Sequence, residues 1–292
     1  MNVLYAHEGV ESTRRVPTPI GVFDSGAGGL TILSALRKEL PYENFIYFGD
    51  TAHCPYGMRS ASEIVDLSMR ASRFLIERGA KLIVVACNTA SLVALNRLDG
   101  NFSVPFVGVV PAVKLAVQTT QKGRVGVAAT YLAAKSIYLR RLIDEFAEGI
   151  QVYTIGCPEL VTLVELGELD GPAVEQAVRH AMQPLLEQDV DVIVLGCTHF
   201  PALLPMIEYV CGHHVQIIDS TLAVAHHVHS VLNSEALIHT ISPDQTAHGE
   251  LEIWCSGDSM AFSKVANKLL GYPAFAHQTQ PEREPSGTIL VK

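Results

Sequence analysis

The segment Leu82-Ile-Val-Val-Ala-Cys-Asn-Thr-Ala-Ser91 decides how this 292-residue chain folds. Its first four residues are all apolar, which is typical of a strand in a parallel sheet that is covered on both faces. The polar residues that begin at Cys87 predict a short loop and then a helix. A strand that leads directly into a helix is the repeating unit of α/β folds.

The same strand-to-helix rhythm recurs along the whole chain. Further runs rich in apolar and β-branched residues predict strands at 20–23, 44–48, 104–110, 124–128, 151–155, 190–195 and 215–218. Helical patterns lie between most of these strands, for example at 30–40, which Pro41 stops, and at 60–79, which Gly79 closes. The alternation predicts an α/β fold with doubly wound parallel sheets.

One internal similarity indicates two related halves. The stretch Ile83-Val-Val-Ala-Cys-Asn-Thr-Ala-Ser91 resembles Ile193-Val-Leu-Gly-Cys-Thr-His-Phe-Pro201, because each has a strand, then a cysteine, then a polar segment. The two cysteines are 110 residues apart (197 − 87), which is about one domain length. A duplicated half would place both segments at equivalent points of two similar domains.

Composition limits the class of protein. Hydrophobic residues make up 48% and charged residues 17%, which is enough apolar material for a buried core. The net charge of −9, without a Lys/Arg cluster, argues against a nucleic-acid partner. No apolar run approaches the ~20 residues that span a bilayer, and the N-terminus does not resemble a signal peptide. We therefore expect a cytoplasmic protein whose six cysteines are free thiols.

Both ends of the chain differ from its middle. Residues 1–17 are polar and irregular, so we expect a mobile N-terminal extension. From Ala276 the composition turns to Gln, Pro, Glu and Arg, and we expect residues 276–292 to form a mobile tail.

Side chains that can do chemistry gather directly after the predicted strands. In open α/β sheets, ligands bind at the carboxyl ends of the strands. The residues at those positions are Asp24, Ser25, Cys87, Asn88, Thr89, Cys197, Thr198 and His199. We expect them to face one crevice, or two crevices that meet.

Cys87 and Cys197 are the candidates for proton transfer. Each is predicted to precede a helix, whose N-terminus would favour the thiolate and bring a pKa of about 8.5 toward neutrality. The alternative is that both are small core hydrophobes, but their matched positions favour chemistry. The cysteines without such a context are assigned to the core: Cys54, Cys157, Cys211 and Cys255.

Two ionisable side chains could assist the thiols. Asp24 precedes a glycine-rich turn, so it could cap a helix, or it could orient or deprotonate a thiol. His199 lies two residues after Cys197 and could act on that sulfur, or it could be a core histidine. The residues alone leave both choices open.

The sequence offers little support for a nucleotide, metal or pyridoxal site. The turn Gly26-Ala-Gly-Gly-Leu-Thr31 lacks the last glycine of a dinucleotide motif and the lysine of a P-loop, so we expect its glycines to approach a small ligand. The histidine clusters at 213–214 and 226–229 lack metal-ligand spacing, and no lysine follows a strand as a pyridoxal site requires. We therefore expect neither a metal nor a cofactor.

Five motifs together resemble those of the glutamate racemases, the cofactor-independent members of the aspartate/glutamate racemase superfamily. They are Gly21-Val-Phe-Asp-Ser-Gly-Ala-Gly-Gly-Leu-Thr31, Asp50-Thr-Ala-His-Cys-Pro-Tyr-Gly57, Ala86-Cys-Asn-Thr-Ala-Ser91, Cys157-Pro-Glu-Leu-Val-Thr-Leu-Val-Glu165 and Gly196-Cys-Thr-His-Phe-Pro201. The resemblance extends from about Pro19 to about Tyr272 in the family's order and spacing.

This resemblance implies a fold and an activity. The fold would be two α/β domains that face each other across the substrate, one formed by 18–112 with 218–275 and the other by 113–217. The activity would be interconversion of L- and D-glutamate, which supplies D-glutamate for bacterial peptidoglycan. The partner is then a small-molecule substrate, and a homodimer is a candidate assembly.

The resemblance also implies roles for particular residues. Cys87 would face the α-carbon of D-glutamate and Cys197 that of L-glutamate, with Asp24, Glu165 and His199 as supporting acid/base groups. The substrate's carboxylates and ammonium would be held by Ser25, Tyr56, Gly57, Asn88, Thr89 and Thr198, with Asp24 and His199 beside them.

Two alternatives remain beside this interpretation. One is a sister racemase that acts on aspartate or a hydantoin with the same two cysteines. The other is an amino-acid-binding protein without catalytic activity. Two thiols on opposite faces of a Cα are what racemisation without a cofactor needs, because a single base tends to return the proton to the face it came from.

Overall fold

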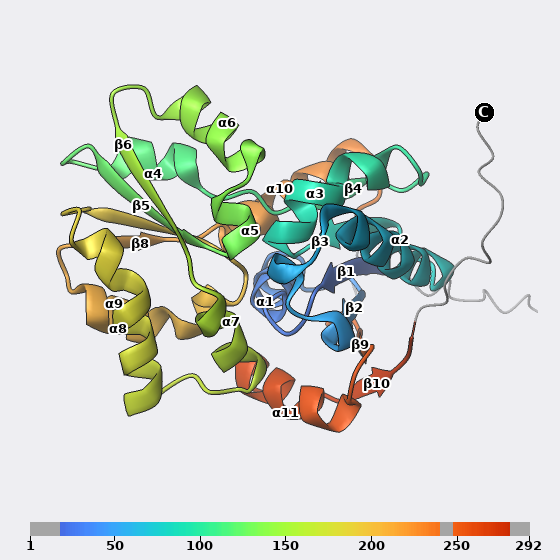
Figure 1. Cartoon of the computed structure of the whole chain (residues 1–292). Coiled ribbons are helices and arrows are strands. Elements are labelled where there is room, and N and C mark those ends of the chain that lie inside the picture. The colour runs from blue at the N-terminus through green and yellow to red at the C-terminus, as the bar shows by residue number, and fades with distance from the viewer. Residues whose placement is uncertain (1–17, 240–247, 281–292) are drawn as a thin grey trace, which may run out of the picture.

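Two separate parallel sheets organise the chain in the computed structural model, which describes residues 18–239 and 248–280 (Figure 1). The larger sheet has six strands in the order β10-β9-β2-β1-β3-β4, and the smaller has four in the order β6-β5-β7-β8. Every pair of neighbouring strands is parallel. The predicted α/β class with doubly wound parallel sheets is therefore confirmed.

The central strands of the larger sheet are buried along their whole length, which is why their sequences are continuous apolar runs. The strands of this sheet are β1 (Ile20–Asp24), β2 (Phe45–Gly49), β3 (Leu82–Val85), β4 (Phe106–Gly108), β9 (Leu251–Cys255) and β10 (Ala276–Gln278).

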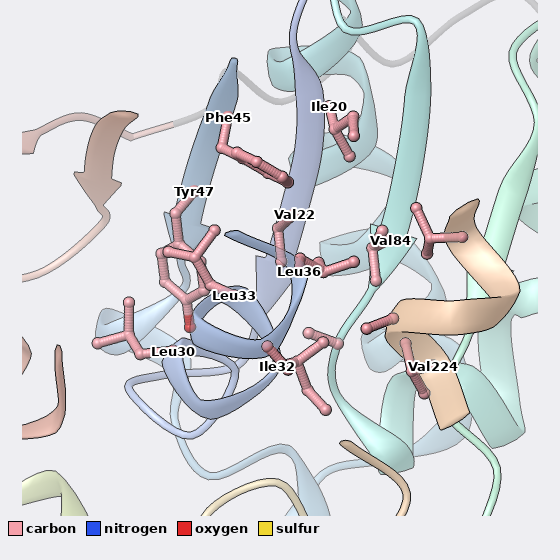
Figure 2. Packing of buried hydrophobic residues seen from close by; sticks show 14 of the residues in the cluster. Ile20, Val22, Leu30, Ile32, Leu33, Leu36, Phe45, Tyr47, Val84 and Val224 are labelled. Atoms are coloured by element: carbon pink, nitrogen blue, oxygen red, sulfur yellow. The ribbon is translucent and has the colours of Figure 1, made fainter. Parts of the chain in front are cut away.

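Helices cover both faces of the larger sheet. One face is covered by α1 (Leu30–Glu39), α10 (Thr221–Ser234) and α11 (Ser259–Leu270), and the other by α2 (Ala61–Glu77) and α3 (Asn88–Asp99). Figure 2 shows the first of these layers, with Leu33 and Leu36 of α1 over Val22 of β1. Val224 of α10 belongs to the same cluster. The chain therefore returns to the larger sheet after the segment that forms the smaller sheet. Each fully buried side chain of this size contributes roughly 1.5–3 kcal/mol.

The smaller sheet is also covered on both faces. Its strands are β5 (Arg124–Ala129), β6 (Gln151–Gly156), β7 (Val192–Gly196) and β8 (Gln216–Ile218). Its helices are α7 (Pro158–Glu165), α8 (Pro172–Leu186) and α9 (Leu204–Cys211) on one face, and α4 (Val113–Thr119) and α6 (Ile137–Phe146) on the other. A short helix, α5 (Tyr131–Ala134), follows β5 and contacts α3 of the first sheet (Figure 1).

The sequence prediction missed the two strands that complete the larger sheet. β9 carries Glu252 and a partly exposed Trp254 among its apolar residues, and β10 is a three-residue edge strand with two exposed polar side chains. Neither has the apolar run by which the other strands were predicted. The predicted tail therefore begins too early, because 276–278 pair with 253–255.

Both predicted terminal segments lie wholly or partly outside the described residues. These are the N-terminal extension 1–17 and the last part of the tail, 281–292. The division into two domains that fold as units stays a prediction. No helix in the described part of the chain is both long and apolar enough to cross a membrane.

Candidate active site

The carboxyl ends of four strands converge on one small cavity. In the larger sheet β1 ends at Asp24 beside β3, and in the smaller sheet Ala129 of β5 pairs with Gly196 of β7. The residues that follow these ends line the cavity from both sides. Its lining is Ser25, Pro55, Tyr56, Gly57, Cys87, Asn88, Thr89, Thr130, Val161, Cys197, Thr198 and His199.

The cavity is nearly closed. Its volume is about 10 Å3, which is room for about one water molecule. Sites that hold small molecules usually measure ~300–1,000 Å3. An amino acid can therefore enter only if the walls from the two sheets move apart, and the closed arrangement excludes bulk water.

Cys87 caps the helix that follows its strand. The Ala90 N–H donates to Cys87 Sγ at 3.5 Å, and that thiol donates to Ser25 Oγ at 3.7 Å. The expected shift of its pKa toward neutrality is wrong, because burial, together with the nearby Asp24, raises the pKa of Cys87 to about 12. One N–H and a helix N-terminus do not offset complete desolvation.

Asp24 connects the two sheets behind the residues that line the cavity. Its carboxyl group accepts hydrogen bonds from the Gly26 N–H at 2.8 Å and from Thr198 Oγ1 at 3.1 Å. Burial raises the pKa of Asp24 above its ordinary value, although the nearby His199 opposes this shift. Ser25 Oγ lies 3.5 Å from the carboxyl and 3.7 Å from Cys87 Sγ, so Asp24 reaches that thiol through a hydroxyl group.

Cys197 has a charged partner. Nδ1 of His199 lies 3.7 Å from Cys197 Sγ, and Nε2 lies 2.6 Å from Glu165 Oε1. Burial lowers the pKa of His199, but hydrogen bonds to Cys197, Cys54 and Glu165 outweigh it and raise the pKa well above 6.5. Burial raises the pKa of Glu165, but its bonds to His199 outweigh this and hold it below 4.5. At neutral pH the pair is an imidazolium and a carboxylate.

The source of positive charge at Cys197 differs from the prediction. A short 3-10 turn, Phe200–Leu203, follows Cys197 before α9 begins at Leu204. The α-helix that follows in the chain therefore does not begin at this sulfur. His199 supplies the positive charge beside Cys197 that the helix was expected to supply.

The glycine-rich turn approaches protein side chains, which corrects the expectation that it approaches a ligand. The Ala27 N–H donates to Glu165 Oε1 at 2.7 Å. A Cβ atom on Gly26 would lie 2.0 Å from that oxygen, and one on Gly28 would lie 2.4 Å from Nδ1 of His199. Both positions need glycine because the turn after β1 of the larger sheet passes directly against His199 and Glu165 of the smaller sheet's half.

Seven of the eight residues expected to hold substrate line the cavity and Asp24 does not, and several of the seven are already hydrogen-bonded. The Tyr56 hydroxyl donates to Asp50 Oδ2 at 2.7 Å, and the hydroxyl groups of Thr89 and Thr130 lie 3.0 Å apart. Asn88 Nδ2 is the exception, because this buried donor has no partner among the described residues. Buried donors are rarely left unpaired, so Asn88 offers a hydrogen bond to a ligand.

Two polar residues of this site were not predicted from the sequence. Thr130 comes directly after β5, so the strand-end rule that selected the cysteines could have found it. Cys54 was assigned to the core, yet it is half-buried, and its Sγ atom lies within 4.8 Å of a ring nitrogen of His199 and a carboxylate oxygen of Glu165. No local pattern points to that contact. The remaining cysteines, Cys157, Cys211 and Cys255, are buried as predicted.

Two thiols face one small cavity from two α/β sheets, with a carboxyl group and an imidazole behind them, and this arrangement suits an enzyme that acts on a small molecule. Comparison with known proteins agrees with this class. The model of the Asp/Glu/Hydantoin racemase family matches residues 31–228, and the chain belongs to that family. It is an isomerase.

Individual relatives cover nearly the whole chain. The glutamate racemase of Herpetosiphon aurantiacus is 46% identical over 251 residues, which are 86% of this chain and 97% of that protein. The crystal structure of a glutamate racemase from Bacillus anthracis matches with a TM-score of 0.82 at 33% identity and covers 91% of this chain and 98% of its own. The crystal structure of the glutamate racemase of Francisella tularensis in complex with D-glutamate matches with a TM-score of 0.78 at 29% identity. The match covers 90% of this chain and 98% of that protein.

Proposed function

We propose that this enzyme interconverts L- and D-glutamate by transferring the α-proton between two cysteines, without a cofactor. One observation carries the proposal: Cys87 and Cys197 line the same cavity from opposite sheets. Inversion at Cα requires removal of a proton from one face and delivery of a proton to the other. Two acid/base groups on opposite walls meet that requirement.

The relatives support glutamate as the substrate. Curated proteins named glutamate racemase are 37–46% identical to this chain over most of its length, and the Francisella tularensis protein was crystallised with D-glutamate. Aspartate or a hydantoin is the alternative substrate for the same two thiols. Relative rates on glutamate and aspartate distinguish them.

In the direction from L- to D-glutamate, the Cys197 thiolate removes the α-proton and becomes a thiol. The electron pair of the broken C–H bond passes into the α-carboxylate, and the Cys87 thiol then delivers its proton to the opposite face of Cα. The reverse direction exchanges the two roles. His199 stabilises the thiolate that starts the reaction at Cys197, and the high pKa of Cys87 keeps it protonated as the acid.

The cavity walls would stabilise the charge that develops on the α-carboxylate. Asn88 Nδ2 is a buried donor without a partner among the described residues. Asn88 is also the first residue of α3, so the backbone N–H groups of the first turn of that helix lie beside it. Donors fixed in a space that excludes water interact with developing charge more strongly than water does. Ser25, Thr89 and Thr198 add hydroxyl groups around the same cavity.

Isotope incorporation tests this function. The purified protein, freed of metal by dialysis against EDTA and without pyridoxal phosphate, is incubated with L-glutamate in D2O. We expect optical rotation to fall to zero and deuterium to appear at Cα. The Cys87→Ser, Cys197→Ser double variant is the control and should do neither. Faster racemisation of aspartate than of glutamate would contradict the assigned substrate, and no deuterium exchange with either would contradict the mechanism.

The biological role that we propose is supply of D-glutamate for peptidoglycan. A bacterial strain that requires external D-glutamate for growth should grow without it when it expresses this chain. Failure of an active, well-expressed enzyme to restore growth would contradict the role and leave the chemistry unaffected.

A further inference from the structure

Cys54 brings a third thiol to the ion pair behind Cys197. Its Sγ atom, a carboxylate oxygen of Glu165 and a ring nitrogen of His199 all lie within 4.8 Å of one another. The three residues come from different parts of the chain: the loop after β2, the last residue of α7 and the segment after β7. No spacing in the sequence could have shown this cluster.

The donor set and its size suit one kind of ligand. A thiolate, an imidazole and a carboxylate are the groups that bind Zn2+, usually three from the protein with the fourth position open. Two oxygen or nitrogen ligands at ~2.0 Å in a tetrahedral site lie ~3.3 Å apart. Nε2 of His199 and Oε1 of Glu165 are 2.6 Å apart, so they need to separate by less than ~1 Å to admit the ion.

The ion can reach the cluster. The side chain of Glu165 is 21% exposed and Cys54 is half-buried, whereas His199 is buried. Glu165 is also the last residue of its helix, so its side chain can shift without a change in the helix. An ion would enter on the side of Glu165 and Cys54 and meet His199 last.

We propose that Cys54, Glu165 and His199 form a binding site for Zn2+, and that the bound ion reversibly inhibits the enzyme. Binding exchanges protons for metal, because the thiol proton of Cys54 and the proton between His199 and Glu165 leave to the buffer. The inhibitory effect rests on the proposed function, in which His199 and Glu165 support Cys197. An ion bound to both side chains separates this pair, whose atoms lie 2.6 Å apart in the free protein, and withdraws it from the reaction.

Metal binding can be measured without any activity. We would titrate the protein with Zn2+ by calorimetry, and with Co2+ by absorption, where a cobalt–thiolate bond gives an intense charge-transfer band in the near ultraviolet. The wild-type protein should bind one equivalent of either ion. Cys54→Ala should weaken Zn2+ binding at least ~100-fold, since loss of a direct ligand costs no less than loss of an outer-shell partner. Cys211→Ala, which removes a buried cysteine on α9, is the matched control and should bind as the wild type does.

The double variant Cys87→Ser, Cys197→Ser separates this site from the catalytic thiols. It should keep the cobalt–thiolate band, because Cys54 is intact. Loss of the band in this variant, or a Zn2+ affinity of Cys54→Ala equal to that of the wild type, would overturn the proposal. Cys54→Ser, which preserves the size of the side chain, replaces the alanine variant if thermal melting shows that the latter is unfolded.

Inhibition is the second measurement. Zn2+ should suppress racemisation by the wild type and by Cys211→Ala at concentrations that match the calorimetric Kd, and EDTA should restore it. Inhibition that develops without stoichiometric binding at Cys54 would contradict the proposal. If the wild type shows no racemisation at all, the proposed function fails, while the binding data still decide whether the metal site exists.

Discussion

Cys87 and Cys197 follow equivalent strand ends, β3 and β7, yet their surroundings differ. Cys87 lies at the start of a long helix, and its neighbours are the Ser25 hydroxyl and, beyond it, the buried Asp24. Cys197 lies before a short 3-10 turn and has an imidazolium as its partner, which is itself paired with Glu165. Similar sequence segments have therefore acquired opposite electrostatic environments.

In the proposed mechanism, this difference would make one thiol the acid and the other the base. A buried thiol beside a carboxyl group holds its proton, and the pKa of Cys87 is about 12. A thiol next to an imidazolium loses its proton more readily. One acid and one base ready in the same cavity are what a single proton-transfer event requires.

Removal of either sulfur should have the largest effect. Cys87→Ser and Cys197→Ser should each lower kcat for racemisation by roughly 10²–10⁴-fold, because a serine hydroxyl is a much weaker base than a thiol. Circular dichroism should show that both variants are folded, and Cys211→Ser should keep normal activity. Near-normal turnover by either catalytic variant would show that proton transfer does not need two thiols.

The partners of the thiols should differ in their effect on the two directions. His199→Asn should slow proton abstraction from L-glutamate, and Asp24→Asn abstraction from D-glutamate, each by roughly 10²-fold. The equilibrium must stay at equal amounts of both enantiomers, since a catalyst cannot move it. Primary isotope effects with Cα-deuterated L- and D-glutamate report each direction separately.

The Asp24 variant also tests the connection between the sheets. Asp24 accepts a hydrogen bond from Thr198 of the second sheet, so part of its effect could appear in both directions. Thr198→Val removes that bond and one hydroxyl group of the cavity wall but keeps the Asp24 carboxyl group, so it provides the matched comparison. If His199→Asn and Asp24→Asn both raise the isotope effects equally in the two directions, these residues bind substrate and do not serve one thiol each.

The His199–Glu165 pair should contribute a smaller, pH-dependent stability. Glu165→Gln should lower the free energy of unfolding by about 1.5–3 kcal/mol, the range for a hydrogen bond to a charged group. The pKa of Glu165 is lowered from 4.5, so its contribution is lost as the pH falls through that lowered value. The pKa of His199 is raised from 6.5, so its contribution is lost as the pH rises through that raised value.

The difference between wild type and Glu165→Gln should therefore be greatest between pH 4.5 and 6.5 and shrink on both sides. Thermal or urea unfolding at several pH values measures it. Glu175→Gln, which breaks an exposed pair with Arg179, is the control and should change stability by less than about 1 kcal/mol. A difference that does not vary with pH would show that the buried pair is uncharged.

Removal of metal should leave the racemase activity unchanged. Because the proposed reaction uses only side chains of the protein, dialysis against EDTA should leave kcat and KM unchanged in metal-free buffer. Activity that disappears with EDTA and returns with Zn2+ would replace the two-thiol mechanism with a metal-dependent one.

Local patterns predicted much of this molecule. Runs rich in apolar and β-branched residues, such as 82–85, predicted eight of the parallel strands. The central strands are apolar along their whole length because both of their faces are covered. The rule that ligands meet strand ends selected Cys87, Cys197 and Asp24 before any contact was known. It could have selected Thr130 as well.

Only the tertiary structure decided how these groups are paired. The sequence by itself determined which side chains follow strands, since that depends on neighbours along the chain. Whether a thiol faces a hydroxyl or an imidazolium depends on residues far away, such as Glu165 beside His199 and Thr198 beside Asp24. The pKa of Cys87 moves upward because the folded chain removes it from water. The approach of Cys54 to Glu165 and His199 has the same origin, because three segments meet there only after both sheets have formed.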